Sequence, residues 1–476
     1  MANHILLTLL TLGLSAMFAH GADLYVDPNT GDDAADGRSA PVRTIARAVR
    51  LAGPGDTVHL AKAVYRESVD LTGKSGERER PLVIDGHDAV IEGSRDIAPS
   101  DWQEVGPGLY RNTTLFEQPL RRQEEWVWRW FFLFDGKMNR MGRCMKGTNA
   151  PYKNPADLSP GEWTYQQNDG HAFYVRIDPA KKLGDCRIAT PWLVNGVSVH
   201  GANHHLVIRN LTATHVLNDG YNISPAKDAQ IRDVLFENIR SIECGDDGLS
   251  AHGNSTVRVD GFYSTRNGTG LCTTGNSANN RLLIRDNVGY EVYFYPYPYP
   301  GPTAHAIANS RIECRADNGC LIQGGKNPDD LCLVKLNNVV IQAMPGGPPR
   351  SSRLALDQRA RLEGQNLTLA GLALTLGVRG ASISDSVIAG GAAASIEIAS
   401  DAAWEARRNV FDIAHLRLGL VTYTATQFEA YQRASGQDTA SKWEPIDVAP
   451  LLASESHIEI EGKPVGAAVQ FLPQHP

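Results

Sequence analysis

The region from about residue 196 to residue 415 repeats a pattern of short apolar segments that each run into an Asn or an Asp. Copies of this pattern lie at 205–212, 234–240, 282–287 and 334–340. A second pattern, a polar residue followed by Gly and a short apolar stretch, recurs at 219–224, 247–252, 269–274 and 318–323, and its first three copies start 28 and 22 residues apart. Such periods, with Asn at the corners, are typical of a solenoid. The Leu spacing and helical half of leucine-rich repeats are absent. The pattern therefore predicts an all-β fold, a right-handed parallel β-helix.

The segments that flank this repeat predict a capped solenoid. Apolar residues at helical spacing over 41–52, with Pro41 at the start and Gly53 after the end, predict a capping helix. Short strands are expected at 24–26, 57–60, 82–84 and 89–91. We assign 22–100 to the N-terminal cap and first coils, 196–415 to the main β-helix and 416–476 to a C-terminal closing segment.

Residues 101–195 differ in composition from the repeat region and are predicted to be an inserted antiparallel β module. They hold six of the eight tryptophans. Segments 161–165 and 172–177 predict a hairpin around Asn168-Asp169-Gly170. The alternation in Trp126-Val127-Trp128-Arg129-Trp130 predicts a further strand.

Composition and charge exclude some classes of function. The chain has 46 Lys and Arg against 53 Asp and Glu, a formal net charge of -7, which argues against a nucleic-acid-binding protein. Hydrophobic residues make up 42% and charged residues 21%, as in globular chains. The seven cysteines form no zinc-binding pattern, so most are expected to be small buried side chains, with room for one disulfide.

The N-terminus predicts export. Residues 5–19 are almost entirely apolar, too short to span a bilayer comfortably, and Ala19-His20-Gly21 offers a small-x-small cleavage site. We read residues 1–21 as a secretory signal peptide, although no Lys or Arg precedes the apolar run. The mature protein is expected to be a secreted, extracellular or periplasmic monomer that has no membrane segment after cleavage.

The two ends of the chain carry a family resemblance. Tyr25-Val26-Asp27-Pro28, Ala48-Val49 and Ala52–Val58 resemble the start of secreted pectin-lyase-like β-helix proteins, and Phe428–Tyr431 with Gly436-Gln437-Asp438 resembles their closing coil. The resemblance implies the β-helix fold and a polysaccharide partner. It leaves the reaction open, because this fold hosts lyases, hydrolases, epimerases and non-catalytic adhesins.

Three aspartates are the strongest candidates for chemistry. Equivalent residues of successive coils stack about 4.8 Å apart, so the repeat places Asp219 beside Asp247, with Asp246 next to it. Two carboxylates at this spacing repel by about 3 kcal/mol at an effective dielectric near 20, which raises one pKa or requires a cation. Either Ca²⁺ binds there or the acids share protons for general acid/base work. The alternative is that the Asp-Gly pairs are there because both residues suit turns, in which case the acids face solvent.

Two family patterns compete for this trio. It resembles the calcium site of a pectate lyase family, although Ser250 and Cys272 stand where that family has a further Asp and a Lys base. It also resembles polygalacturonase-like hydrolases, although Thr269 takes the place of a His and no Arg-x-Lys follows. A fainter likeness to mannuronan epimerases rests on Asp247 and His252, without their acid-Pro-His run.

Further candidates lie on the same coils. His252 is a possible base, or else a corner residue. Cations and amides that could bind a uronate or sugar hydroxyls, but that also suit solvated surface positions or turns, are Lys227, Arg266, Arg281, Asn222 and Asn254. The run Tyr293–Pro300 is expected to be an extended loop rather than a central strand, with Tyr295 and Tyr297 stacking on sugar rings or packing on the wall.

These observations together predict an exported polysaccharide-degrading enzyme. The favoured mechanism is β-elimination of an acidic glycan, with Ca²⁺ held by Asp219, Asp246 and Asp247. The first alternative is an inverting hydrolase that uses paired aspartates and no cofactor. The second is a non-catalytic carbohydrate-binding or surface β-helix.

Overall fold

The computed structural model describes residues 21–117, 124–147, 150–295, 301–315, 319–324, 327, 329–344, 352–453 and 457–469. Residues 1–20 of the expected signal peptide lie outside this part of the chain. Within it, most strands join one 26-stranded sheet that coils into a long solenoid and is parallel apart from one pairing at its end, which confirms the predicted β-helix. No helix among the described residues is long and apolar enough to cross a membrane.

Long strands form two walls of each coil because they bend in the middle. They are β5 (Leu82–Glu92), β15 (His204–Thr214), β17 (Ile231–Ile242), β19 (Ser255–Thr265), β21 (Asn276–Arg285), β23 (Thr303–Cys314), β25 (Cys332–Ala343), β27 (Ala360–Ala370), β30 (Val387–Ile398) and β32 (Val410–Leu418). Asn210, Asn238, Asn309 and Asn338 make the bend with φ near +50°, a conformation that Asn tolerates better than most residues. The Asn repeat in the sequence therefore marks the bends.

Short strands form the remaining wall. They are β4 (Val69–Asp70), β14 (Val197–Gly201), β16 (Tyr221–Pro225), β18 (Asp247–Ala251), β20 (Thr269–Thr273), β22 (Val292–Phe294), β24 (Gly319–Ile322), β26 (Arg353–Leu356) and β28 (Ala373–Leu376). Inward side chains stack from coil to coil, as in the register Ile208–Phe236–Val259, and all three are at most 1% exposed. Successive coils bury a continuous core in this way.

The N-terminal end is capped as predicted. Helix α1 (Ile45–Leu51) lies against β1 (Asp23–Val26) and β2 (Thr57–Leu60), with β3 (Val64–Tyr65) following. The Thr44 side chain accepts a hydrogen bond from the backbone of Arg47 and so caps the helix.

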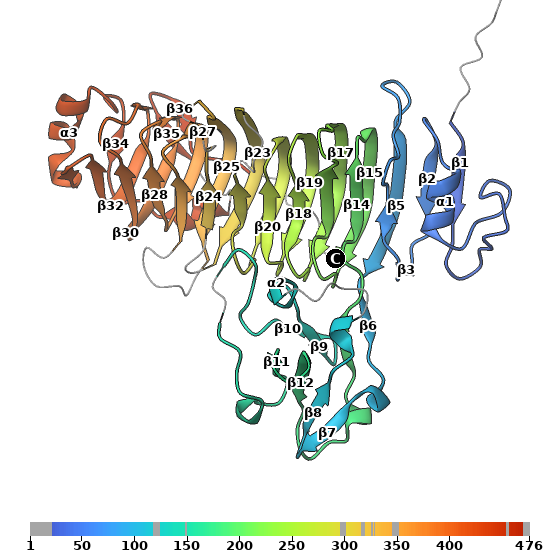
Figure 1. Ribbon diagram of the computed structural model, residues 1–476. Coiled ribbons are helices and arrows are strands. Elements are labelled where there is room, and N and C mark those ends of the chain that lie inside the picture. Colours follow the sequence, from blue (N-terminus) through green and yellow to red (C-terminus); the bar gives the residue numbers. More distant parts are fainter. Residues whose placement is uncertain are drawn as a thin grey trace, which may run out of the picture.

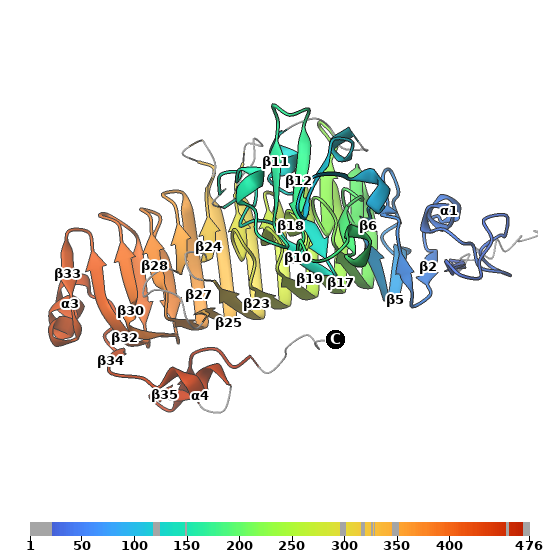
Figure 2. The ribbon, with the colours of Figure 1, turned by 90° about the horizontal axis from the view of Figure 1, so that it is seen from below.

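The opposite end of the solenoid is also closed. Strands β29 (Ala381–Ser384), β31 (Trp404–Arg407), β33 (Val421–Tyr423) and β34 (Lys442–Trp443) complete the last coils, and helix α3 (Phe428–Ser435) lies over them. Trp404 donates to the Tyr431 hydroxyl, which donates to Asp438. Helix α4 (Val448–Leu452) and the hairpin β35 (Ile458–Ile460) and β36 (Lys463–Val465) then run back along the outside (Figure 2).

An antiparallel module projects from the side of the solenoid (Figure 1). One of its sheets holds β6 (Ser94–Asp96), β9 (Phe132–Phe134), β10 (Lys137–Asn139) and β13 (Ile188–Pro191); the other holds β7 (Gln103–Gly106), β8 (Leu109–Asn112), β11 (Trp163–Gln166) and β12 (Ala172–Arg176). The β11–β12 pair is the predicted hairpin. The aromatic core of the module includes Trp130, Trp163 and Phe173.

Two local predictions were wrong. The Trp126–Trp130 segment is not a strand but helix α2 (Glu124–Val127) and a turn, because Val127 and Trp130, three residues apart, are the buried pair. The start of the Tyr293–Pro300 run is a central strand, since β22 pairs with both β20 and β24. Its prolines begin only at residue 296, so the β22 backbone keeps its donors.

All seven cysteines lie in the described part of the chain, and none forms a disulfide there. Six of them are buried, in line with the expected packing role.

Candidate active site

The solenoid register brings the three predicted aspartates together. Tyr221 pairs with Leu249, so Asp219 lies beside Asp247 on the next coil, and the backbone N–H of Asp247 donates to Asp219 Oδ1 at 3.0 Å. One carboxylate oxygen from each of Asp219, Asp246 and Asp247 lies within 4.8 Å of the other two. The three residues are only 2%, 3% and 1% exposed, so they are not solvent-facing turn residues.

The glycines that follow Asp219 and Asp247 are required by packing. A Cβ atom at Gly248 would lie 2.4 Å from Ser264 Oγ and 2.5 Å from the carbonyl oxygen of Gly270, and one at Gly220 would lie 2.3 Å from Ser241 Oγ. Successive coils therefore touch at the Asp-Gly corner. This contact fixes the backbone that carries the acids.

Two cations from the inserted module bind the acids. Lys146 Nζ lies 3.0 Å from Asp246 Oδ1 and 2.7 Å from Asp247 Oδ1. Arg129 Nε donates to Asp246 Oδ2 at 2.8 Å. Sequence reasoning missed both residues, because about a hundred positions separate them from the acids and no repeat places them.

The cations and the burial set the protonation of the trio. Burial, together with the charges of Asp247 and Asp246, raises the pKa of Asp219 well above its ordinary value. Burial also raises the pKa of Asp247, and the Lys146 charge offsets only part of this. For Asp246, burial acts in the same direction, but Lys146 and Arg129 outweigh it and lower the pKa. Three neighbouring carboxyls thus have pKa values that are pushed apart.

Amide side chains hold Asp219 in place. Asn222 Nδ2 donates to Asp219 Oδ2 at 2.6 Å, and Asn218 Nδ2 donates to the same oxygen at 3.1 Å. The predicted sugar-binding Asn222 is therefore part of the acid cluster and orients Asp219.

His252 lies on the short-strand wall near the same cluster. Its Nε2 is 3.0 Å from Ser250 Oγ, and the Ser250 hydroxyl is among the groups that lower the pKa of Asp247, against the effect of burial. Burial and the Lys146 charge lower the pKa of His252 to about 4, so the ring is neutral near pH 7. A polar chain His252–Ser250–Asp247 thus leads to the acids.

Tyrosine rings continue this wall. Tyr290, Tyr293 and Tyr295 form a stacked column with centroid distances of 5.1 and 4.6 Å. Burial raises the pKa of Tyr293 to about 12, and Asp247 and Lys146 are among the charges that act on it. Tyr295 therefore belongs to the site surroundings, whereas Tyr297 lies outside the described residues.

The other predicted binding residues lie in different settings. Lys227 and Asn254 are exposed in turns that follow β16 and β18. Arg266 pairs with Glu243 at 2.8 Å, and Arg281 pairs with Asp260 at 2.5 Å near the bend of β21.

The trio in this arrangement does not fit Ca²⁺. Carboxylate oxygens are the ligands that Ca²⁺ takes. However, the Lys146 ammonium already lies between Asp246 and Asp247, and Arg129 binds the other oxygen of Asp246, so three acids face two cations. An ion held by all three acids would have to displace Lys146.

Comparisons with known proteins give only distant likenesses. No protein-family profile and no curated protein matches the chain. Among solved structures, a XylC structure in complex with xylose matches at 12% identity and a TM-score of 0.45, covering 88% of this chain and 82% of that one. A glycoside hydrolase matches at 12% and 0.40, covering 79% and 95%. A GH136 lacto-N-biosidase from Eubacterium ramulus matches at 11% and 0.34, covering 89% and 68%. These neighbours are too distant to assign a family or a substrate.

Proposed function

We propose that this chain is an exported glycan-cleaving enzyme that works by hydrolysis, with the trio Asp219, Asp246 and Asp247 as its acid/base machinery. The observation that carries the proposal is the geometry of the cluster: three buried carboxyl groups lie side by side, and only Asp246 and Asp247 contact Lys146, so their environments push their pKa values apart. Neighbouring carboxyls with separated pKa values are how enzymes obtain an acid and a base at one pH. Burying three acids side by side is costly unless cations compensate their charges.

The roles follow from the environments. Asp219 keeps its proton near neutral pH and is the general acid that protonates the leaving glycosidic oxygen. Asp247 accepts the proton of the attacking water, and Ser250 and His252 connect it to the short-strand wall. Asp246 stays ionised and holds Lys146 and Arg129. General acid/base steps of this kind contribute roughly 10²–10⁴-fold in rate.

The substrate would lie along the short-strand wall beside the acids. Asn222, His252, Tyr293 and Tyr295 are partly exposed there. The faces of tyrosine rings suit stacking on sugars.

Calcium-assisted β-elimination remains the alternative reaction. The ion would have to displace Lys146 from the trio, and a lysine base would have to be neutral. Although burial opposes it, Asp246 and Asp247 raise the pKa of Lys146 well above its ordinary value, so Lys146 stays charged. This is why we place hydrolysis first.

A polysaccharide panel with and without EDTA separates the two reactions. New reducing ends that EDTA does not prevent support hydrolysis, whereas unsaturated products that absorb in the ultraviolet and need Ca²⁺ support elimination. Asp219→Asn and Asp247→Asn should each lower cleavage by at least about a hundredfold. The matched control is Asp260→Asn, an ion-paired aspartate near the β21 bend, which should retain activity. Full activity in both site variants would refute the assignment.

A non-catalytic role is the second candidate, and the burial of the trio favours it. Acids that are at most 3% exposed and bonded to Lys146 and Arg129 also serve to dock the module on the solenoid. In that case the protein binds glycans without products, and the Asp219→Asn variant binds as well as the wild type.

A further inference from the structure

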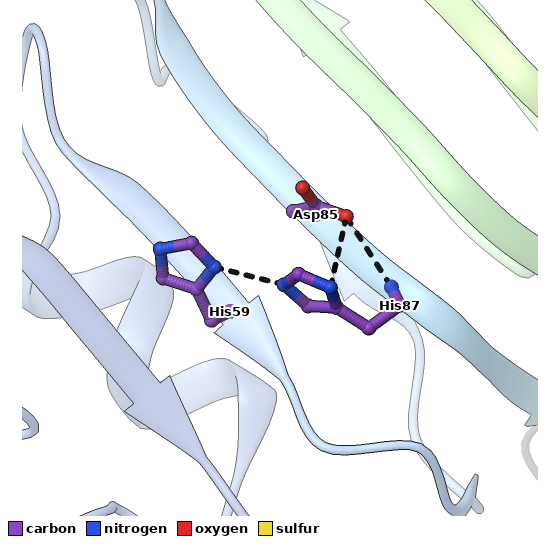
Figure 3. Close-up of side chains that lie close together, drawn as sticks. All are labelled: His59, Asp85 and His87. Atoms are coloured by element: carbon purple, nitrogen blue, oxygen red, sulfur yellow. Dashed lines mark hydrogen bonds and ion pairs between the residues drawn. The ribbon is translucent and has the colours of Figure 1, made fainter.

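A second cluster of metal-ligating side chains lies on the outside of the first coils (Figure 3). His59 on β2 and Asp85 on β5 are register neighbours, and His87 follows two residues later. Candidate ligand atoms of the three residues lie within 4.8 Å of one another. None of the three contributes to the acid cluster described above.

The bend of β5 contains extra residues, and these bring His87 close to His59. Between Arg209 and Leu211, β15 makes its bend with Asn210 alone, but β5 uses Gly86, His87 and Asp88 between the partners of those two residues. His87 and Asp88 have φ of +46° and +63°. The coil does not need these additional residues to turn, and they carry His87 back toward β2.

The imidazole rings of His59 and His87 meet at their edges. His59 Nδ1 lies 2.9 Å from His87 Nε2, and the ring centroids are 5.2 Å apart with an interplanar angle of 24°, so the rings meet edge to edge. Two ring nitrogens at this distance share one proton or one cation.

A carboxylate lies near the far nitrogen of each ring, within hydrogen-bond distance at His59 and farther away at His87. His59 Nε2 lies 3.0 Å from Asp23 Oδ1, and His87 Nδ1 lies 3.8 Å from Asp85 Oδ1. Asp85 is itself fixed by Arg209 and Asn210 at 2.8 and 2.9 Å. A carboxylate on the outer nitrogen orients a metal-binding histidine.

The site opens to solvent and to a hollow of about 840 Å³. Tyr25, Arg38, Pro41, Lys62 and both histidines line this hollow. The His59 side chain is 22% exposed and that of His87 is 50% exposed, so water can complete a coordination sphere and the His87 ring has room to turn.

We propose that His59 and His87 bind one divalent transition-metal ion, with Asp23 and Asp85 as orienting partners and water as the remaining ligands. Imidazole ligands suit Cu²⁺, Ni²⁺ and Zn²⁺, and affinities follow the order that puts Cu²⁺ first. Metal–nitrogen bonds of about 2.0–2.1 Å let two nitrogens 2.9 Å apart share an ion only at nearly a right angle. That angle belongs to square or octahedral ions, which favours Cu²⁺ and Ni²⁺ over tetrahedral Zn²⁺.

The test is a titration of the untagged full chain with CuCl₂, NiCl₂, ZnCl₂ and MgCl₂. A His4→Ala background removes the histidine near the chain start, which could bind copper by itself. We expect one Cu²⁺ per chain, weaker Ni²⁺ and Zn²⁺ binding and none of Mg²⁺. The Cu²⁺ spectrum in electron paramagnetic resonance should show two nitrogen ligands. Affinity should fall as the pH is lowered, because protons compete for imidazole.

Variants assign the site. His59→Ala and His87→Gln should abolish stoichiometric binding, and Asp23→Asn should weaken it by about tenfold. His200→Ala removes an exposed histidine from β14 and should leave binding unchanged. Circular dichroism of the metal-free variants checks that the solenoid is intact. Substoichiometric binding by the background protein, or equal binding by the His59→Ala/His87→Gln double variant, would overturn the proposal.

Discussion

Lys146 Nζ lies 2.7 Å from Asp247 Oδ1, and this contact joins the inserted module to the second of the two coils that carry the acids. The lysine side chain is 16% exposed and the aspartate 1%. The pair is therefore a buried ion pair between two parts of the chain that are far apart in sequence.

Lys146→Ala should strongly destabilise the protein. It leaves Asp246 and Asp247 without their shared cation, and breaking a buried pair in this way costs about 3–5 kcal/mol. Urea unfolding followed by tryptophan fluorescence, which reports largely on the module, measures the loss.

The control for this variant is Lys153→Ala. Lys153 belongs to the same module but pairs with Glu162 near the surface, and such pairs contribute about 0–1 kcal/mol. Equal losses in the two variants would show that the Lys146 contacts carry no special weight.

Asp219→Asn should change the pH dependence of stability. The pKa of Asp219 is raised in the folded protein, chiefly by burial and then by Asp247. Such an acid stabilises the fold below its ordinary pKa of 3.8, and this contribution is lost as the pH rises through the raised value. Near pH 8 the variant should therefore be at least as stable as the wild type.

Asp260→Asn is the control with the opposite sign. The hydrogen bond from Arg281 lowers the pKa of Asp260, so its stabilising effect is present above the ordinary value and lost as the pH falls. Urea midpoints at pH 4 and pH 8 compare the two variants. A loss of stability near pH 8 in Asp219→Asn would contradict the raised pKa.

His215 should make stability depend on alkaline pH. The ring lies between Glu92 and Glu243, with nitrogen–oxygen distances of 2.9 Å to each. Burial alone would lower its pKa, but the hydrogen bonds and charges of Glu243 and Glu92 raise it to about 9. A raised histidine pKa gives stability that is complete below the ordinary value of 6.5 and is lost as the pH rises toward 9.

The measurement compares unfolding midpoints of the wild type and His215→Gln at pH 6 and pH 10. The wild type should have its larger advantage at pH 6. His200→Gln, at an exposed position, should show no such difference. An advantage of equal size at both pH values would place the His215 pKa outside this window.

The sequence predicted the site residues whose positions follow from the repeat. It missed those that come from the inserted module. Asp219 and Asp247 are one coil apart, so a ladder alone makes them neighbours. Lys146 and Arg129 reach the acids through tertiary docking of the module, for which no local pattern exists. Arg281 was expected near the site because it lies on a neighbouring coil, but it is located near the strand bend and pairs with Asp260.

Gly248→Ala tests whether packing explains the Asp-Gly motif. The added methyl group would meet Ser264 Oγ at 2.4 Å and the carbonyl oxygen of Gly270 at 2.5 Å, and a backbone carbonyl cannot move without shifting its coil. Overpacking of this kind costs roughly 1–3 kcal/mol. The shift would also reach Asp247, which directly precedes Gly248, so stability and any glycan cleavage should fall together. Gly184→Ala is the matched control, because a Cβ atom there would meet nothing within 4 Å and should leave both properties unchanged. A Gly248→Ala protein with wild-type stability would show that the contact between coils does not require a glycine at this position.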